Sequence, residues 1–238
     1  MKTDHFGGKS VKEHLKEART RGAQASAEIH GVEIPGHWAA GADAARETAF
    51  LLGLLFLIFH PSFWALFMTA LGILIWKVGR SALLGWARLE RLHRLIEEER
   101  WEIEHHRPEE EEELTALYQA KGFSGQLLKD VVSTLSSDDN RLLQIMLEEE
   151  MGLTLEVYEH PLKQASGAGI GVISSSALVL LASFGDFWGI VAMVGAITIA
   201  STWIMAHLQK NRLLESIIWS LAIVIFGLGV VYFLQRII

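Results

Sequence analysis

Glutamates in the middle of the chain are spaced as metal ligands on a helix would be. Glu99 and Glu102 stand three residues apart, and Glu110 and Glu113 repeat this spacing. Residues at i and i+3 share one face of a helix, so each pair can present two carboxylates on the same side. Two such pairs on neighbouring helices could converge on one cation, and oxygen clusters suit hard divalent ions. The spacing therefore predicts a metal site, with a solvated helix face as the alternative for so acidic a run.

A methionine and a second acidic run extend this pattern. Met146 precedes the glutamates at 148–150, and its polarizable sulfur would bias a shared site toward a transition metal. Met146 also lies on the apolar stripe of its predicted helix, so plain core packing is the alternative. The Glu-x-x-His step of di-iron bundles occurs twice in those proteins, but here one copy stands at Glu102 and His105. The sequence therefore gives little support for a di-iron oxidase, and no enzyme is predicted.

The composition indicates a membrane protein. Half of the 238 residues are hydrophobic and none is cysteine, and the mean hydropathy is +0.27. These values are typical of a membrane protein rather than a soluble enzyme, and they exclude disulfides and thiolate metal sites. The net charge is −7, with the acidic residues concentrated in the middle of the chain. Nucleic acid is therefore not expected as a partner.

Apolar segments flank the glutamates on both sides. Three near the C-terminus each approach the roughly 20 residues that cross a bilayer. They cover residues 165–184, 187–208 and 214–234. A fourth, residues 62–76, is predicted to continue as one helix into the glutamates, because no proline occurs between Pro61 and Pro108.

The first span carries ionisable residues. Its uninterrupted apolar part covers only residues 49–59, so a helix of spanning length must start near residue 40. This start brings Asp43, Arg46 and Glu47 to membrane depth, where ionisable groups indicate function by default. Asp43 and Glu47 are thus candidate transport-path residues. The alternative is that Arg46 simply pairs with one of them; it can neutralise one acid more easily than both, which leaves one over.

Basic residues orient the spans. The linkers at 60–62 and 185–186 carry no Lys or Arg, whereas basic residues gather at 77–94 and 210–212 on the other side. The N-terminus and the acidic segment are therefore predicted to be cytoplasmic. The predicted fold is all-α, a five-span helical membrane protein with a cytoplasmic helical metal-binding domain between spans two and three. Its parts are a cytoplasmic N-terminal segment (1–38), spans one and two (39–85), the acidic domain (86–160) and spans three to five (161–238).

Two further patterns leave alternatives open. Val11, Leu15 and Ala18 form a weak apolar stripe, which fits a short amphipathic helix on the cytoplasmic leaflet. Small residues at 167, 171 and 175 form a stripe that allows close helix contact, either within the subunit or across a dimer.

The histidines of the N-terminal region lack ligand spacing, so a metal site there is not favoured. They are His5, His14, His30 and His37.

Two motifs resemble the vacuolar iron transporter family. Residues 112–123 read Glu-Glu-Leu-Thr-Ala-Leu-Tyr-Gln-Ala-Lys-Gly-Phe. They resemble that family's cytoplasmic domain, with its Glu-Leu, two residues, an apolar residue and Tyr, then Lys-Gly and an apolar residue. Residues 146–153, Met-Leu-Glu-Glu-Glu-Met-Gly-Leu, look like the family's Met-Leu-x-Glu-Glu-x-Gly-Leu segment. The resemblance extends from about residue 88 to the C-terminus.

The resemblance implies five spans, a homodimer in the lipid bilayer, and a pore lined by the first two helices. It also implies a cytoplasmic domain that collects divalent metal ions, ferrous iron first, with manganese and zinc as alternatives. The metal ligands that it implies are Glu99, Glu102, Glu110, Glu113, Met146 and Glu150.

The pore motifs depart from the family. The family has Asn-Asp-Gly in the first span, where this chain has Gly-Ala-Asp-Ala at 41–44. In the second span, Lys77 stands where the family has Met, and Gly-Arg-Ser at 79–81 stands where it has Gly-Glu-Tyr. Two hypotheses follow. The first is a proton-coupled transporter of ferrous iron or manganese, which exports or sequesters the ion from the cytoplasm across a bacterial inner membrane or a vacuole-type membrane. The second is a membrane-anchored metal sensor or buffer. A salt-bridged, closed helix pair at Asp43, Glu47 and Lys77 would favour the second.

Overall fold

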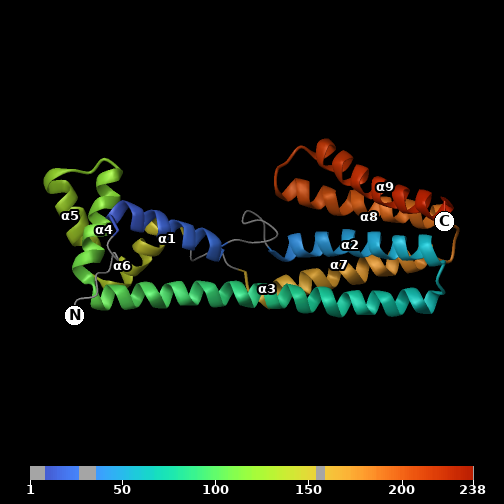
Figure 1. The fold of residues 1–238 in the computed structure, drawn as a ribbon, viewed down its shortest axis with the longest axis horizontal. Helices are drawn as coiled ribbons and strands as arrows, with labels where there is room; N and C mark the ends of the chain where they lie inside the picture. Colours follow the sequence, from blue (N-terminus) through green and yellow to red (C-terminus); the bar gives the residue numbers. More distant parts are fainter. Residues whose placement is uncertain (1–8, 27–35, 154–158, 238) are drawn as a thin grey trace. The chain divides into compact units, whose positions relative to one another are not determined.

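The computed structural model describes residues 9–26, 36–153 and 159–237, and every regular element in these ranges is helical (Figure 1). The predicted all-α class is confirmed for this part of the chain. The elements are α1 (Val11–Ser26), α2 (Gly36–Phe59), α3 (Phe63–His105), α4 (Arg107–Ala120), α5 (Gly125–Leu135), α6 (Asp139–Ile145), the π-helical turn η1 (Met146–Glu150), α7 (Pro161–Ala182), α8 (Phe187–Leu208) and α9 (Leu213–Ile237).

The chain forms two compact units. The acidic unit comprises Met1–Ala27 and Ala87–Tyr158, and the apolar unit comprises Glu28–Trp86 and Glu159–Ile238. Helix α3 contributes to both, because it runs unbroken from Phe63 to His105, as the lack of an internal proline predicts. The acidic unit therefore contains α1 as well as the segment that follows α3.

The apolar unit has the surface of a membrane protein. Its core holds Leu52, Leu66 and Val194, while Trp64 and Ile75 of α3, among many other large apolar side chains, point outward and are largely exposed. A soluble protein rarely exposes so large an apolar surface, whereas lipid would cover it. Among the described residues, α3, α7, α8 and α9 are long and apolar enough to cross a membrane.

Helix α2 is the predicted first span, and it differs from the other four. It begins at Gly36 and has 24 residues, a few more than the roughly 20 expected from the sequence. It is not among the helices that qualify as spans, since any spanning stretch of it contains Asp43, Arg46 and Glu47. It nevertheless packs against α7, α8 and α9. The prediction of five spans therefore depends on α2.

Small residues bring α2 and α7 together within the subunit. A Cβ atom on Gly167 would lie 2.1 Å from the carbonyl oxygen of His37, and one on Gly171 would lie 2.1 Å from that of Gly41. No side chain fits at such a distance, so the two backbones touch because these residues are glycine. The sequence left open whether the small-residue stripe packs within the subunit or across a dimer. Gly167 and Gly171 of this stripe pack within one chain.

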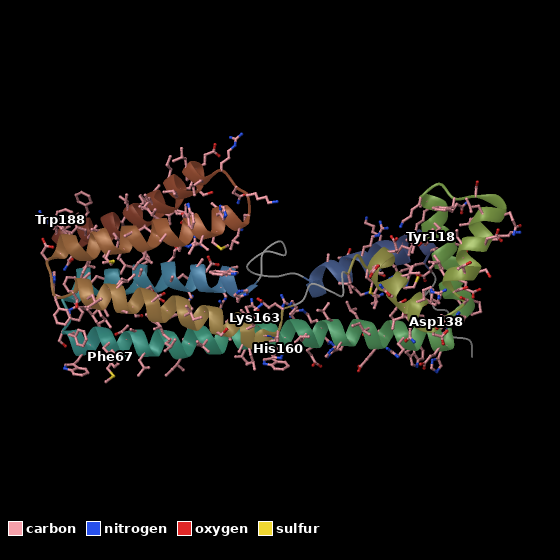
Figure 2. The ribbon with its side chains drawn as sticks, turned by 180° about the vertical axis from the view of Figure 1, so that it is seen from behind. Phe67, Tyr118, Asp138, His160, Lys163 and Trp188 are labelled. Atoms are coloured by element: carbon pink, nitrogen blue, oxygen red, sulfur yellow. The ribbon has the colours of Figure 1, made fainter. Side chains whose placement is uncertain are left out.

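The two ends of the apolar unit are distinct. Phe63 stacks on Phe184 at 5.3 Å between ring centroids, and Gln235 donates a hydrogen bond of 3.2 Å to the carbonyl of Ile58. These contacts place the α2–α3 turn, the α7–α8 turn and the end of α9 together. In Figure 2, Phe67 and Trp188 lie toward this end, and His160 and Lys163 lie at the opposite one.

Candidate metal centre

Apolar stripes build the acidic unit. Helices α3 and α4 each contribute buried leucines, and the short α6–η1 segment adds three leucines and Met146. The buried core comprises Ala18, Leu92, Leu95, Ile103, Leu114, Leu117, Leu142, Leu143, Met146, Leu147, Met151 and Leu153. The helical periodicity seen in the sequence therefore produces the bundle that positions the glutamates.

Caps fix the ends of the segment that carries Glu150. The Asp138 carboxylate accepts a hydrogen bond of 2.9 Å from the backbone N–H of Arg141, which caps α6. At the other end, Gly152 adopts a positive φ of 68°, and the Leu153 N–H donates to the carbonyl of Leu147 at 2.9 Å. This is the glycine-dependent stop expected after a helix. Between the caps, η1 is a π-helical turn, a rare form that is frequent at functional sites.

Four glutamates among the described residues of the acidic unit are buried. Glu99, Glu110 and Glu113 are each 1% exposed and Glu150 is 2% exposed. One oxygen from each of Glu99, Glu110 and Glu150 lies within 4.8 Å of the others, close enough to hold one metal ion. Burying several ionised carboxylates together costs several kcal/mol for each, so they require a cation or protons.

Burial decides the charge of this cluster. It is the largest cause that raises the pKa of Glu110 to about 11, and the neighbouring carboxylates of Glu99 and Glu113 raise it further. Burial and the same two neighbours raise the pKa of Glu150 to about 10. Without a metal ion, Glu110 and Glu150 therefore hold protons at neutral pH, and a metal ion must displace these protons.

A histidine that the sequence does not predict as a ligand completes a second group. His14 of α1 is buried, with its Nε2 atom 3.5 Å from Glu113 Oε1 and 4.0 Å from Glu150 Oε1. Ligand atoms of these three residues also lie within 4.8 Å of one another. Helix α1 packs against α4 and η1, and Ala18 of its apolar stripe is buried in the core with Leu15 packed beside it, so this stripe faces protein instead of a membrane surface. The expectation of a leaflet-bound helix is thus wrong for α1.

The remaining predicted ligands lie beside these groups. Met146 is fully buried in the core. Glu102 is half-buried and belongs to neither group of possible ligands among the described residues, but its charge helps to raise the pKa of Glu110 and Glu150.

The two acidic runs contain both buried and solvated glutamates. Glu110 and Glu113 face inward, while Glu112 between them is exposed. In the second run Glu150 is buried, whereas Glu148 is exposed and accepts a hydrogen bond of 3.0 Å from Gln144. Helical spacing, not charge alone, separates the candidate ligands from the solvated face.

The predicted transport-path acids are both paired with cations. Arg46 binds Asp43 on α2, and Lys77 of α3 binds Glu47. The expectation that one acid is left over is therefore wrong, because Lys77 neutralises the carboxylate that Arg46 leaves. The sequence identifies Lys77 as a departure from the family but not as the partner of Glu47.

One comparison with known proteins gives a match. The model of the VIT family matches residues 87–236, more than half of the chain. A search of curated proteins finds no match. The resemblance to the vacuolar iron transporters is thereby confirmed. The match covers the acidic unit from Ala87 onward and the helices α7 to α9, while His14, Asp43, Glu47 and Lys77 lie outside it.

Proposed function

Since the chain belongs to the VIT family, whose members transport metal ions across membranes, we propose that it carries ferrous iron or manganese. In this proposal the glutamate cluster of the acidic unit collects the ion before it crosses. The observation that carries the proposal is the burial of Glu99, Glu110 and Glu150 around one point.

The ligand set favours a first-row transition metal. Mg²⁺ dehydrates reluctantly and usually keeps several waters, which a buried cluster does not favour. His14 adds a nitrogen donor to the same cluster, and Met146 lies in the core of the same unit. Nitrogen and sulfur donors bind transition metals in preference to Mg²⁺ or Ca²⁺.

The charge distribution supports a direction. Lys163, Lys210 and Arg212 lie at the end of the apolar unit opposite the α2–α3 and α7–α8 turns. Under the positive-inside rule this end faces the cytoplasm, from which α3 continues into the acidic unit. We infer five spans, with α2 as the first, and export or sequestration of the ion from the cytoplasm. The proposal also includes proton coupling and a homodimer, which rest on the family resemblance.

A sensor or buffer is the second candidate, and the ion pairs favour it. Asp43 and Glu47 are each neutralised by a fixed cation, so a passing ion must displace Arg46 or Lys77. A protein that only binds metal would have no need to open these pairs.

Uptake into proteoliposomes tests the transporter. The full-length protein, reconstituted with a pH gradient and given Mn²⁺, should fill the vesicles with manganese. Glu110→Gln should slow uptake, because the ion loses one of its buried ligands, whereas Glu112→Gln on the exposed face of the same helix should not.

A second comparison separates the two candidates. Glu47→Gln should stop uptake and leave metal binding by the acidic unit unchanged, while Lys77→Met should make Glu47 available and speed uptake. If the unmodified protein binds Mn²⁺ stoichiometrically but moves none, the transporter is excluded and the sensor or buffer is supported.

A further inference from the structure

We propose that His14, Glu113 and Glu150 hold a second divalent transition-metal ion, next to the one held by Glu99, Glu110 and the shared Glu150. This inference rests on the proposed function, since it concerns the same cluster. It adds a ligand from α1, which lies outside the part of the chain that the family model matches.

The distances around His14 fit two ligands of one ion. With metal–ligand bonds of about 2.1 Å, two ligand atoms on a common ion lie roughly 3.0–4.2 Å apart, depending on the angle between the bonds. His14 Nε2 lies 3.5 Å from Glu113 Oε1 and 4.0 Å from Glu150 Oε1. Both separations fall within this range and exceed the 2.7–2.9 Å of charge-assisted hydrogen bonds.

Close packing holds His14 at this place. On α1, Ala18 is completely buried in the core of the acidic unit. One turn further on, a Cβ atom on Gly22 would lie 2.2 Å from the carbonyl oxygen of Met151, so α1 touches the backbone directly after η1. The imidazole of His14 is therefore presented to the carboxylates by a helix in backbone contact with the segment that carries Glu150.

Charge balance is met by two ions. Glu99, Glu110, Glu113 and Glu150 carry four negative charges when all are ionised. With one divalent ion, two of these buried carboxylates must stay protonated, whereas two divalent ions neutralise all four without protons. Glu150 belongs to both groups, and a carboxylate has two oxygens with which to bridge ions about 3.5–4 Å apart, as in two-metal sites.

The nitrogen donor makes the second position distinguishable from the first. The Glu99, Glu110 and Glu150 group offers oxygen alone, while the His14 group offers one imidazole nitrogen and two carboxylates. An ion at the second position would join three segments, α1, α4 and η1.

Manganese alone, added to the full-length protein in mild detergent, tests the proposal. Bound Mn²⁺ is counted by equilibrium dialysis, and electron spin echo modulation detects a coordinated imidazole nitrogen. We expect ¹⁴N modulation that changes to the ¹⁵N pattern when the protein is labelled with ¹⁵N-histidine. This measurement needs no variant, so it remains decisive even if a substitution prevents folding.

His14→Gln should abolish the nitrogen modulation and weaken one of the two ions at least tenfold, the lower end of what loss of even an outer-shell partner costs. His93→Gln, an exposed histidine of the same unit, should change neither. If Mn²⁺ binds without nitrogen modulation, or the modulation survives His14→Gln, the second position is refuted while the proposed function stands. If no Mn²⁺ binds, both are refuted.

Discussion

Metal binding should expel protons from the buried cluster, and the structure sets how many. In the metal-free protein, burial and neighbouring carboxylates raise the pKa of Glu110 to about 11 and that of Glu150 to about 10. Both groups are therefore protonated at pH 7, and a divalent ion that uses both as ligands should release up to two protons.

The magnitude follows from linkage. Each displaced proton changes the apparent affinity about tenfold per pH unit, so two should strengthen Mn²⁺ binding by up to about 100-fold from pH 6 to pH 7. The metal-free stability has the opposite sign. In the unfolded chain, the pKa of Glu110 and of Glu150 has its usual value of 4.5. Between about pH 4.5 and pH 10, the folded state therefore binds more protons than the unfolded state does. The contribution of these two groups to the metal-free stability is thus fully present below about pH 4.5 and falls as the pH rises, by at most about 1.4 kcal/mol per pH unit for each group.

Calorimetry on the full-length protein measures the proton release. Mn²⁺ titrations at pH 7 in buffers of different ionisation enthalpy should show an observed heat that depends on the buffer, with a slope that gives the number of protons released. Glu110→Gln carries a neutral amide in place of the protonated acid, so it should release about one proton fewer, whereas Glu112→Gln should match the unmodified protein. A heat independent of the buffer would refute the assignment of protonated glutamates in the metal-free cluster.

Three further substitutions test the packing and the site. Gly171→Ala should lower the unfolding free energy by about 1–3 kcal/mol, since its Cβ would meet the backbone of Gly41. Gly195→Ala is the control, because open space surrounds this glycine. Equal melting temperatures for the two variants would contradict the α2–α7 contact. Met146→Leu keeps the core volume and should lower the unfolding free energy by less than about 1.5 kcal/mol. If the Met146 thioether is a ligand, its loss should weaken Cd²⁺ binding more than Mn²⁺ binding. An unchanged ratio of Cd²⁺ to Mn²⁺ affinity would leave Met146 a core residue. Gly152→Ala should cost about 1–2 kcal/mol in a thermal melt, because φ there is +68°, and no loss would argue against the stop after η1.

The glutamates could be predicted from the sequence because their arrangement is local. A spacing of three places Glu110 and Glu113 on one face of α4 whatever the rest of the chain does. The unbroken helix α3 could be predicted as well, since no proline interrupts it. Both predictions use rules that act within a few turns of one helix.

His14 could not be found in this way, because its contacts join residues far apart in the sequence. A local sign exists nevertheless. His14 stands three residues after Val11 and four before Ala18, so it shares the face that those apolar residues bury. A histidine on a buried face requires polar neighbours, and the acidic helices of the chain could supply them. Which helix does so depends on how α1 docks, and periodicity does not contain that information.

The two units neutralise their acidic side chains differently, because an arriving ion can replace the neutralising group in one unit but not in the other. In the acidic unit, Glu110 and Glu150 are neutralised by protons, which an arriving ion can displace into water. In the apolar unit, Asp43 and Glu47 are neutralised by side chains that cannot leave. Arginine keeps its charge at any accessible pH, whereas lysine is a single point charge on a flexible stem. Glu47 is also 54% exposed and Lys77 only 13%, so the glutamate is the member of the pair whose side chain already borders open space and can move away. If this chain transports, the Glu47–Lys77 pair is therefore the position where its path must open, and Asp43 with Arg46 remains closed.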